Sequence, residues 1–183
     1  QMAAGAGAKV VLPGRFSAAE MGAIAKAFVD EEGTVANGAP AIFAGLLEYI
    51  RAQDETPDLS RARLVSGSTE PPVSLMKGFR DLTGAEVIHA YGASETTPVV
   101  SVNWQIKPEL GELDEDAKWD LKRSQGVPVA GVEVKVVDPA GEELPRDGKS
   151  MGELMIRGPW IATSYHKLDD NAERFDDGWW KSG

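Results

Sequence analysis

The chain has 183 residues, enough for one full domain or two small ones built around a hydrophobic core. It is 42% hydrophobic and 26% charged, which is ordinary for a globular protein, and no apolar run approaches the roughly 20 residues of a membrane-spanning helix. The net charge of −10 argues against a nucleic-acid-binding surface. The absence of cysteine excludes disulfides and cysteine nucleophiles and fits a reducing compartment, so we expect a cytoplasmic protein.

The first half of the chain alternates strand and helix signals. Short β-branched or apolar runs predict four strands, at residues 9–12, 34–36, 64–65 and 86–90. Apolar residues at helical spacing predict three intervening helices, beginning near Met21, Pro40 and Pro72. Four strands joined by three helices predict right-handed βαβ crossovers and therefore an α/β fold with a parallel sheet.

The second half has a different pattern. Residues 105–124 are strongly charged and are expected to form a solvated helix or loop. Beyond them, residues 132–136 alternate between valine and charged residues, and residues 153–157 give a second strand. We therefore predict an α/β subdomain over residues 1–104, followed by a small antiparallel, β-barrel-like subdomain over residues 105–183.

Two loops at strand ends carry the candidate site, because ligands bind beyond the carboxyl ends of the strands in an open parallel sheet. They are Ser66–Pro71 and Tyr91–Pro98, and both combine glycine with hydroxyl side chains that can bind phosphate. The second loop adds a flat aromatic ring at Tyr91 and a carboxylate at Glu95, which fits Mg²⁺ held between one carboxylate and phosphate oxygens. Either loop taken singly is better explained by the needs of turns and helix caps.

Five blocks in a fixed order make a more specific pattern. Tyr91–Thr96 resembles the Tyr-Gly-x-Thr/Ser-Glu-Thr signature of the adenylate-forming (AMP-binding) superfamily, and Ser66–Pro71 resembles the glycine-rich segment that precedes it there. Three later segments are similar to further family blocks: residues 126–134, 151–159 and 177–183. Tyr165 stands where the family has a glycine-tyrosine pair, and the chain looks most like medium- and long-chain fatty acid–CoA ligases.

The resemblance implies an acid–thiol ligase that adenylates a fatty or other carboxylic acid with ATP and Mg²⁺ and transfers the acyl group to CoA. It implies nucleotide-binding roles for Gly67, Ser68, Thr69, Tyr91, Gly92 and Ser94. Gly92 and Ala93 would lie beside the acyl substrate, and Glu95 would hold the metal. Ser94 and Glu95 are the implied catalytic residues.

The sequence departs from the family pattern in places. Ser68, Thr69 and Glu70 replace smaller residues, and Glu70 brings a charge toward the expected pocket. A phosphate-loop lysine and a mobile C-terminal domain are expected outside the 183 residues, so we read the chain as an internal fragment that is inactive alone and needs the rest of its polypeptide. Two alternatives stay open: another adenylate-forming enzyme (carrier-protein-loading or luciferase-like), or a non-catalytic nucleotide- or acyl-binding module.

Two remaining features favour structural roles over chemical ones. His89 ends a predicted strand with no second histidine or cysteine nearby, so we expect a packed or hydrogen-bonded side chain. Trp179 and Trp180 are expected to pack rather than to bind a ligand.

Overall fold

The computed structural model describes residues 5–14, 17, 20–104, 110–167 and 171–183. The chain folds as two compact units, the first made of residues 1–89 and 103–124 and the second of residues 90–102 and 125–183. The subdomain limits expected at residue 104 stay a prediction. None of the helices in the described ranges is both long and apolar enough to cross a membrane.

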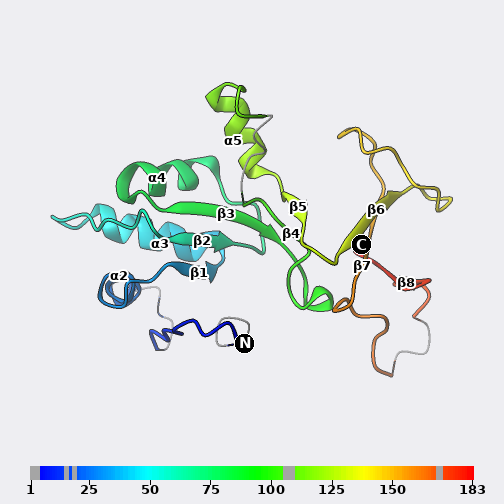
Figure 1. The fold of residues 1–183 in the computed structure, drawn as a ribbon, viewed down its shortest axis with the longest axis horizontal. Helices are drawn as coiled ribbons and strands as arrows, with labels where there is room; N and C mark the ends of the chain where they lie inside the picture. Colours follow the sequence, from blue (N-terminus) through cyan, green and yellow to red (C-terminus); the bar gives the residue numbers. More distant parts are fainter. Residues whose placement is uncertain (1–4, 15–16, 18–19, 105–109, 168–170) are drawn as a thin grey trace. The chain divides into compact units, whose positions relative to one another are not determined.

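Three parallel strands form the centre of the first unit (Figure 1). β2 (Arg63–Ser66) lies between β1 (Val35–Gly38) and β3 (Glu86–Tyr91), with Leu64 level with Val87 in the parallel register. The expected α/β pattern with a parallel sheet is therefore confirmed for this part of the chain.

The helices of the first unit carry the predicted apolar faces. They are α2 (Met21–Asp30), α3 (Pro40–Arg51) and α4 (Val73–Thr83). Pro40 occupies the first turn of α3, where its missing N–H costs no hydrogen bond, and Gly84 ends α4 in the left-handed conformation. Phe43 of α3 meets Phe79 of α4 edge-on, with ring centroids 6.4 Å apart, inside one apolar core.

The strand predicted at residues 9–12 is wrong. These residues are irregular, and Val10 and Leu12 are 53% and 84% exposed. A short β-branched run has strand propensity, but a strand also requires a partner for its backbone groups, and no described strand pairs with this segment. Among the described strands, the parallel part of the sheet thus has three members rather than four.

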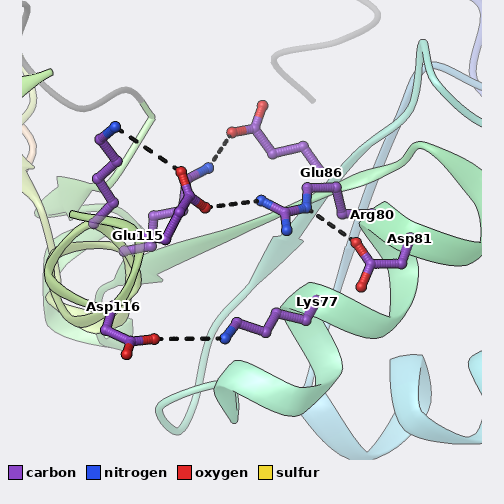
Figure 2. Close-up of polar contacts among 8 residues, drawn as sticks. Lys77, Arg80, Asp81, Glu86, Glu115 and Asp116 are labelled. Carbon is purple, nitrogen blue, oxygen red and sulfur yellow. Dashed lines mark hydrogen bonds and ion pairs between the residues drawn. The ribbon is translucent and has the colours of Figure 1, made fainter.

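α5 (Glu115–Arg123) is the helix within the charged segment, of which residues 105–109 lie outside the described part of the chain. It is not wholly solvated, because Trp119 is buried in the core of the first unit. The Arg80 guanidinium lies 4.5 Å from the centre of the Trp119 ring. Figure 2 shows the ion pairs around this contact, including Lys77 with Asp116 and Arg80 with Glu115.

The second unit is antiparallel. The last residues of β3, Ala90 and Tyr91, pair with β4 (Ser101–Val102), which pairs in turn with β5 (Val127–Pro128). A separate sheet has the strand order β6-β7-β9-β8, formed by β6 (Glu133–Val137), β7 (Glu153–Arg157), β8 (Phe175–Asp176) and β9 (Trp179–Lys181).

The described strands of this part do not close into the expected barrel-like sheet. β6 and β8 are the two ends of the four-stranded order, so the sheet is open. Closing a sheet requires enough strands of matching tilt and stagger, and β8 contributes only Phe175 and Asp176. Trp180 packs in the apolar core of the unit, as expected, and the Trp179 ring lies beside Arg157 and Lys135.

Candidate functional site

The loop after β2 leaves the sheet of the first unit from a buried strand end. Ser66 is fully buried, and its hydroxyl has no hydrogen-bond partner within the described part of the chain. The Gly67 N–H donates to the Gly38 carbonyl of the neighbouring strand, at 3.2 Å. Ser68 and Thr69 follow with exposed side chains. The loop therefore presents two hydroxyl groups at the carboxyl end of a fixed parallel strand, as the sequence predicts.

The charge that Glu70 brings to this loop is paired. The Arg123 Nε–H donates to Glu70 Oε1 at 2.5 Å, and this hydrogen bond raises the pKa of Arg123 above its ordinary value. Both side chains are about half exposed, so solvent screens the attraction. Because Arg123 ends α5, the ion pair joins this helix to the loop.

Two further contacts hold the end of α5 within the first unit. His89 of β3 is buried, and its Nδ1 lies 2.6 Å from the Arg123 carbonyl oxygen. The Asn103 side-chain amide donates to the carbonyls of Leu121 and Ser124, at 2.5 and 3.0 Å. His89 is thus a hydrogen-bonded structural residue, in agreement with the sequence analysis, and Asn103 adds hydrogen bonds to two carbonyls at the end of α5.

The turn after β3 belongs to the second unit and brings together the other predicted residues. Ser94–Thr96 form a single 3₁₀ turn, η1. The buried Thr96 hydroxyl accepts a hydrogen bond from the Ala93 N–H and donates to the Pro98 carbonyl, both at 2.8 Å. Tyr91 packs against the apolar core of the unit, whereas the Ser94 side chain is exposed.

Gly92 is fixed in this turn by the close approach of two backbone segments. A β-carbon at residue 92 would lie 1.6 Å from the carbonyl oxygen of Pro98. Only glycine fits, because the obstructing atom belongs to the backbone and not to a flexible side chain. This packing accounts for the glycine whether or not a ligand also approaches it.

Glu95 makes the longest-range side-chain contact of the turn. The Tyr165 hydroxyl donates to Glu95 Oε1 at 2.6 Å, and the Ala162 N–H donates to the Glu95 carbonyl at 2.7 Å. The hydrogen bond from Tyr165 is the main reason why the pKa of the Glu95 carboxyl lies below its ordinary value, and the same bond, helped by burial, raises the pKa of Tyr165. The pair is therefore a protonated phenol donating to an ionised carboxylate.

The site residues thus lie in two groups. Gly67, Ser68 and Thr69 belong to the first unit, and residues 91–95 belong to the second. Sequence reasoning missed the partners Arg123 and Tyr165, which lie 53 and 70 residues from Glu70 and Glu95. No local pattern signals either contact. Among the described residues, no three acidic, histidine or cysteine side chains gather as a metal cluster, so Glu95 is a candidate for a site with one protein carboxylate.

The family model described as AMP-binding enzyme matches residues 2–166. A medium-chain-fatty-acid–CoA ligase from Ectopseudomonas oleovorans is 38% identical over 181 residues, which are 99% of this chain and 32% of that protein. A 3-methylmercaptopropionyl-CoA ligase from Ruegeria pomeroyi is 41% identical over 150 residues, 82% of this chain and 27% of that protein.

Solved structures agree on the fold. The unliganded o-succinylbenzoate coenzyme A synthetase of Bacillus subtilis has a TM-score of 0.76 at 24% identity, over 99% of this chain and 36% of that one. The same enzyme has been solved in complex with ATP and magnesium ion, with a TM-score of 0.71 at 24% identity, over 92% of this chain and 31% of that one. The chain therefore spans about a third of the length of the curated relatives and solved structures that it matches.

Proposed function

Because the chain belongs to the AMP-binding enzyme family, we propose that it is part of an AMP-forming acid–CoA ligase. In the first step a carboxylate oxygen of the acid attacks the α-phosphorus of ATP, the bond to pyrophosphate breaks, and an acyl-adenylate forms. In the second step the CoA sulfur attacks the acyl carbonyl and AMP leaves. Relatives that align over most of the chain are named as acid–CoA ligases, and this supports the assignment.

One observation carries the assignment of the site. The turn after β3 presents an exposed hydroxyl, Ser94, next to a carboxylate, Glu95, whose lowered pKa keeps it ionised. We propose that Ser94 donates a hydrogen bond to a phosphate of ATP and that the Tyr91 ring stacks on adenine. Gly92 and Ala93 would border the reacting carboxylate of the acid, and Gly67, Ser68 and Thr69 would line the nucleotide site.

We propose Mg²⁺ as the cation of this site, and the chemistry of Glu95 fits it. Mg²⁺ takes one or two protein carboxylates and completes its shell with phosphate and water oxygens. The Tyr165 hydroxyl occupies one carboxylate oxygen, Oε1, and we assign the second oxygen, Oε2, to the cation. The bound cation would neutralise negative charge on the phosphates as pyrophosphate departs.

For the substrate we propose a medium- or long-chain fatty acid. The support is the fatty-acid–CoA ligases that align over almost the whole chain, at 38% and 34% identity. The alternative substrate is a short thioether acid, because one relative is named as a 3-methylmercaptopropionyl-CoA ligase. We propose a cytoplasmic location as well, from the absence of cysteine.

Acid-dependent exchange of pyrophosphate into ATP, measured with the full-length protein, tests the adenylation step. We expect exchange with fatty acids and at least a hundredfold loss in Glu95→Gln, since the cation would lose its carboxylate. Subsequent thioester formation with CoA distinguishes the ligase from carrier-protein-loading and luciferase-like enzymes. A folded protein that exchanges with no short, medium, long or aromatic acid would favour a non-catalytic binding module.

A second measurement concerns the 183 residues alone. They carry the Ser94–Glu95 turn but span only a third of the relatives, so we expect no acyl-CoA from the isolated fragment with ATP, Mg²⁺ and CoA. Detectable product from purified residues 1–183 would contradict this expectation.

A further inference from the structure

The Glu95 carboxylate is held by a side chain from a distant part of the second unit. The Tyr165 hydroxyl lies 2.6 Å from Glu95 Oε1, a distance typical of an O–H donor bonded to an ionised carboxylate. The two residues are 70 positions apart in the sequence. The contact exists only because the segment after β7 returns to the turn after β3.

Tyr165 is itself fixed on several sides. The side-chain amide of Asn171 accepts a hydrogen bond from the Tyr165 N–H at 2.7 Å and donates one to the Tyr165 carbonyl at 3.4 Å. The phenol ring packs edge-on against the buried Phe175, with centroids 5.2 Å apart. A side chain held at its backbone and at its ring loses little further entropy when its hydroxyl donates.

The backbone of Glu95 is fixed from the same segment. The Ala162 N–H donates to the Glu95 carbonyl at 2.7 Å, three residues before Tyr165. One stretch of chain therefore holds both the main chain and one carboxylate oxygen of Glu95. Side chains that orient a metal ligand in this way commonly change metal affinity or activity 10- to 100-fold when they are removed.

We propose that Tyr165 is a positioning residue, which holds Oε1 of Glu95 so that Oε2 is presented to the cation of the bound nucleotide. The inference rests on the proposed function of Glu95. Tyr165 itself touches neither the nucleotide nor the cation in this scheme. Its removal should therefore act through Glu95 alone.

The test replaces single atoms in the full-length protein. Tyr165→Phe removes the hydroxyl and keeps the ring against Phe175, and Tyr49→Phe is the matched control, since Tyr49 lies on α3 in the first unit. Binding of Mn²⁺ in the presence of ATP, followed by electron paramagnetic resonance, measures metal affinity without turnover. The Mg²⁺ concentration at half-maximal ATP–pyrophosphate exchange is the second readout.

We expect Tyr165→Phe to weaken Mn²⁺ binding and raise the half-maximal Mg²⁺ concentration about tenfold, with little change in the KM of the acid. Tyr49→Phe should leave both values unchanged. In a cycle with Glu95→Gln, the double variant should bind Mn²⁺ no worse than Glu95→Gln alone, because the hydroxyl acts through that carboxylate.

The outcomes separate the inference from the proposed function beneath it. Weaker Mn²⁺ binding in Glu95→Gln but unchanged binding in Tyr165→Phe would overturn the positioning role and leave the metal role of Glu95 standing. Unchanged binding in Glu95→Gln would overturn the proposed role of Glu95 itself. Additive losses in the double variant would show that Tyr165 acts independently of Glu95 and would also overturn the inference.

Discussion

Arg123 Nε lies 2.5 Å from Glu70 Oε1, and this hydrogen-bonded ion pair ties the end of α5 to the loop after β2. The same residue is held through its carbonyl by His89 of β3. Within the first unit, a helix from the charged segment is thus connected to a strand end and to the loop that carries Gly67, Ser68 and Thr69.

The ion pair predicts a local effect on that loop. Arg123→Ala should speed amide hydrogen exchange in residues 66–72, by no more than about fivefold because the half-exposed pair is screened by solvent. The exchanged pair Glu70→Arg with Arg123→Glu should restore most of the protection. Exchange rates that stay at the wild-type value in Arg123→Ala would mean that the contact does not order the loop.

Trp119 should be the main attachment of α5. It is buried in the core of the first unit beside Arg80 and Lys77 of α4, so Trp119→Ala leaves a large cavity (Figure 2 shows the surrounding ion pairs). We expect a loss of about 3–5 kcal/mol in the free energy of unfolding. The control is Trp104→Ala, a tryptophan of the same unit that is 47% exposed and should change stability by under about 1 kcal/mol. Equal losses from both substitutions in denaturant titrations would contradict this prediction.

Ser68 has a backbone conformation that favours glycine. Its φ is 73°, in the left-handed region, where a β-carbon costs roughly 1–2 kcal/mol. Ser68→Gly should therefore raise the free energy of unfolding by about 1 kcal/mol. Thr69→Gly, one residue later and also exposed, should instead lower the free energy of unfolding through the greater freedom of the unfolded chain. A destabilising Ser68→Gly would show that the serine hydroxyl contributes more than the strain costs.

Gly92→Ala should disrupt the turn after β3. The added β-carbon would meet the Pro98 carbonyl oxygen at 1.6 Å, and relieving the overlap requires the backbone to move. We expect about 1–3 kcal/mol of destabilisation together with loss of ATP–pyrophosphate exchange. The control is Gly5→Ala, because a β-carbon there meets no atom within 4 Å. Wild-type exchange activity in Gly92→Ala would show that the turn can shift without consequence.

Asp147 gives the second unit a pH-dependent turn. Its carboxylate accepts hydrogen bonds from the N–H groups of Lys149 and Ser150, both at 2.8 Å, and these backbone bonds are the main reason why its pKa lies below the ordinary value. A carboxyl with a lowered folded pKa contributes stability that is complete above its unfolded pKa, about 3.9, and is lost as the pH falls through the lower folded value.

Hydrogen exchange of residues 144–152 at several pH values measures this effect. Protection of the turn should be greater in the wild type than in Asp147→Asn near pH 6, and the difference should shrink as the pH falls below about 4. A difference that is the same at every pH would show that the charge of Asp147 is not what orders the turn.

Local patterns in the sequence determined most of the elements. The apolar spacing of residues 40–50 and the proline at the start of α3 specify that helix with no outside information, and Gly84 ends α4 by its own conformational freedom. The ordered blocks of the sequence likewise indicate the AMP-binding enzyme family. These signals are short-range, since they depend on residues within a few turns of one another.

Only the tertiary structure decided which segments have partners. The run at residues 9–12 resembles a strand but pairs with none of the described strands, and the sheet formed by β6, β7, β9 and β8 stays open. The charged sequence around Trp119 predicts a solvated segment, but packing beside α4 buries this side chain in the core of the first unit. The contacts of Arg123 with Glu70 and of Tyr165 with Glu95 bridge 53 and 70 residues, and such pairings depend on the path of the whole chain, which no local pattern contains.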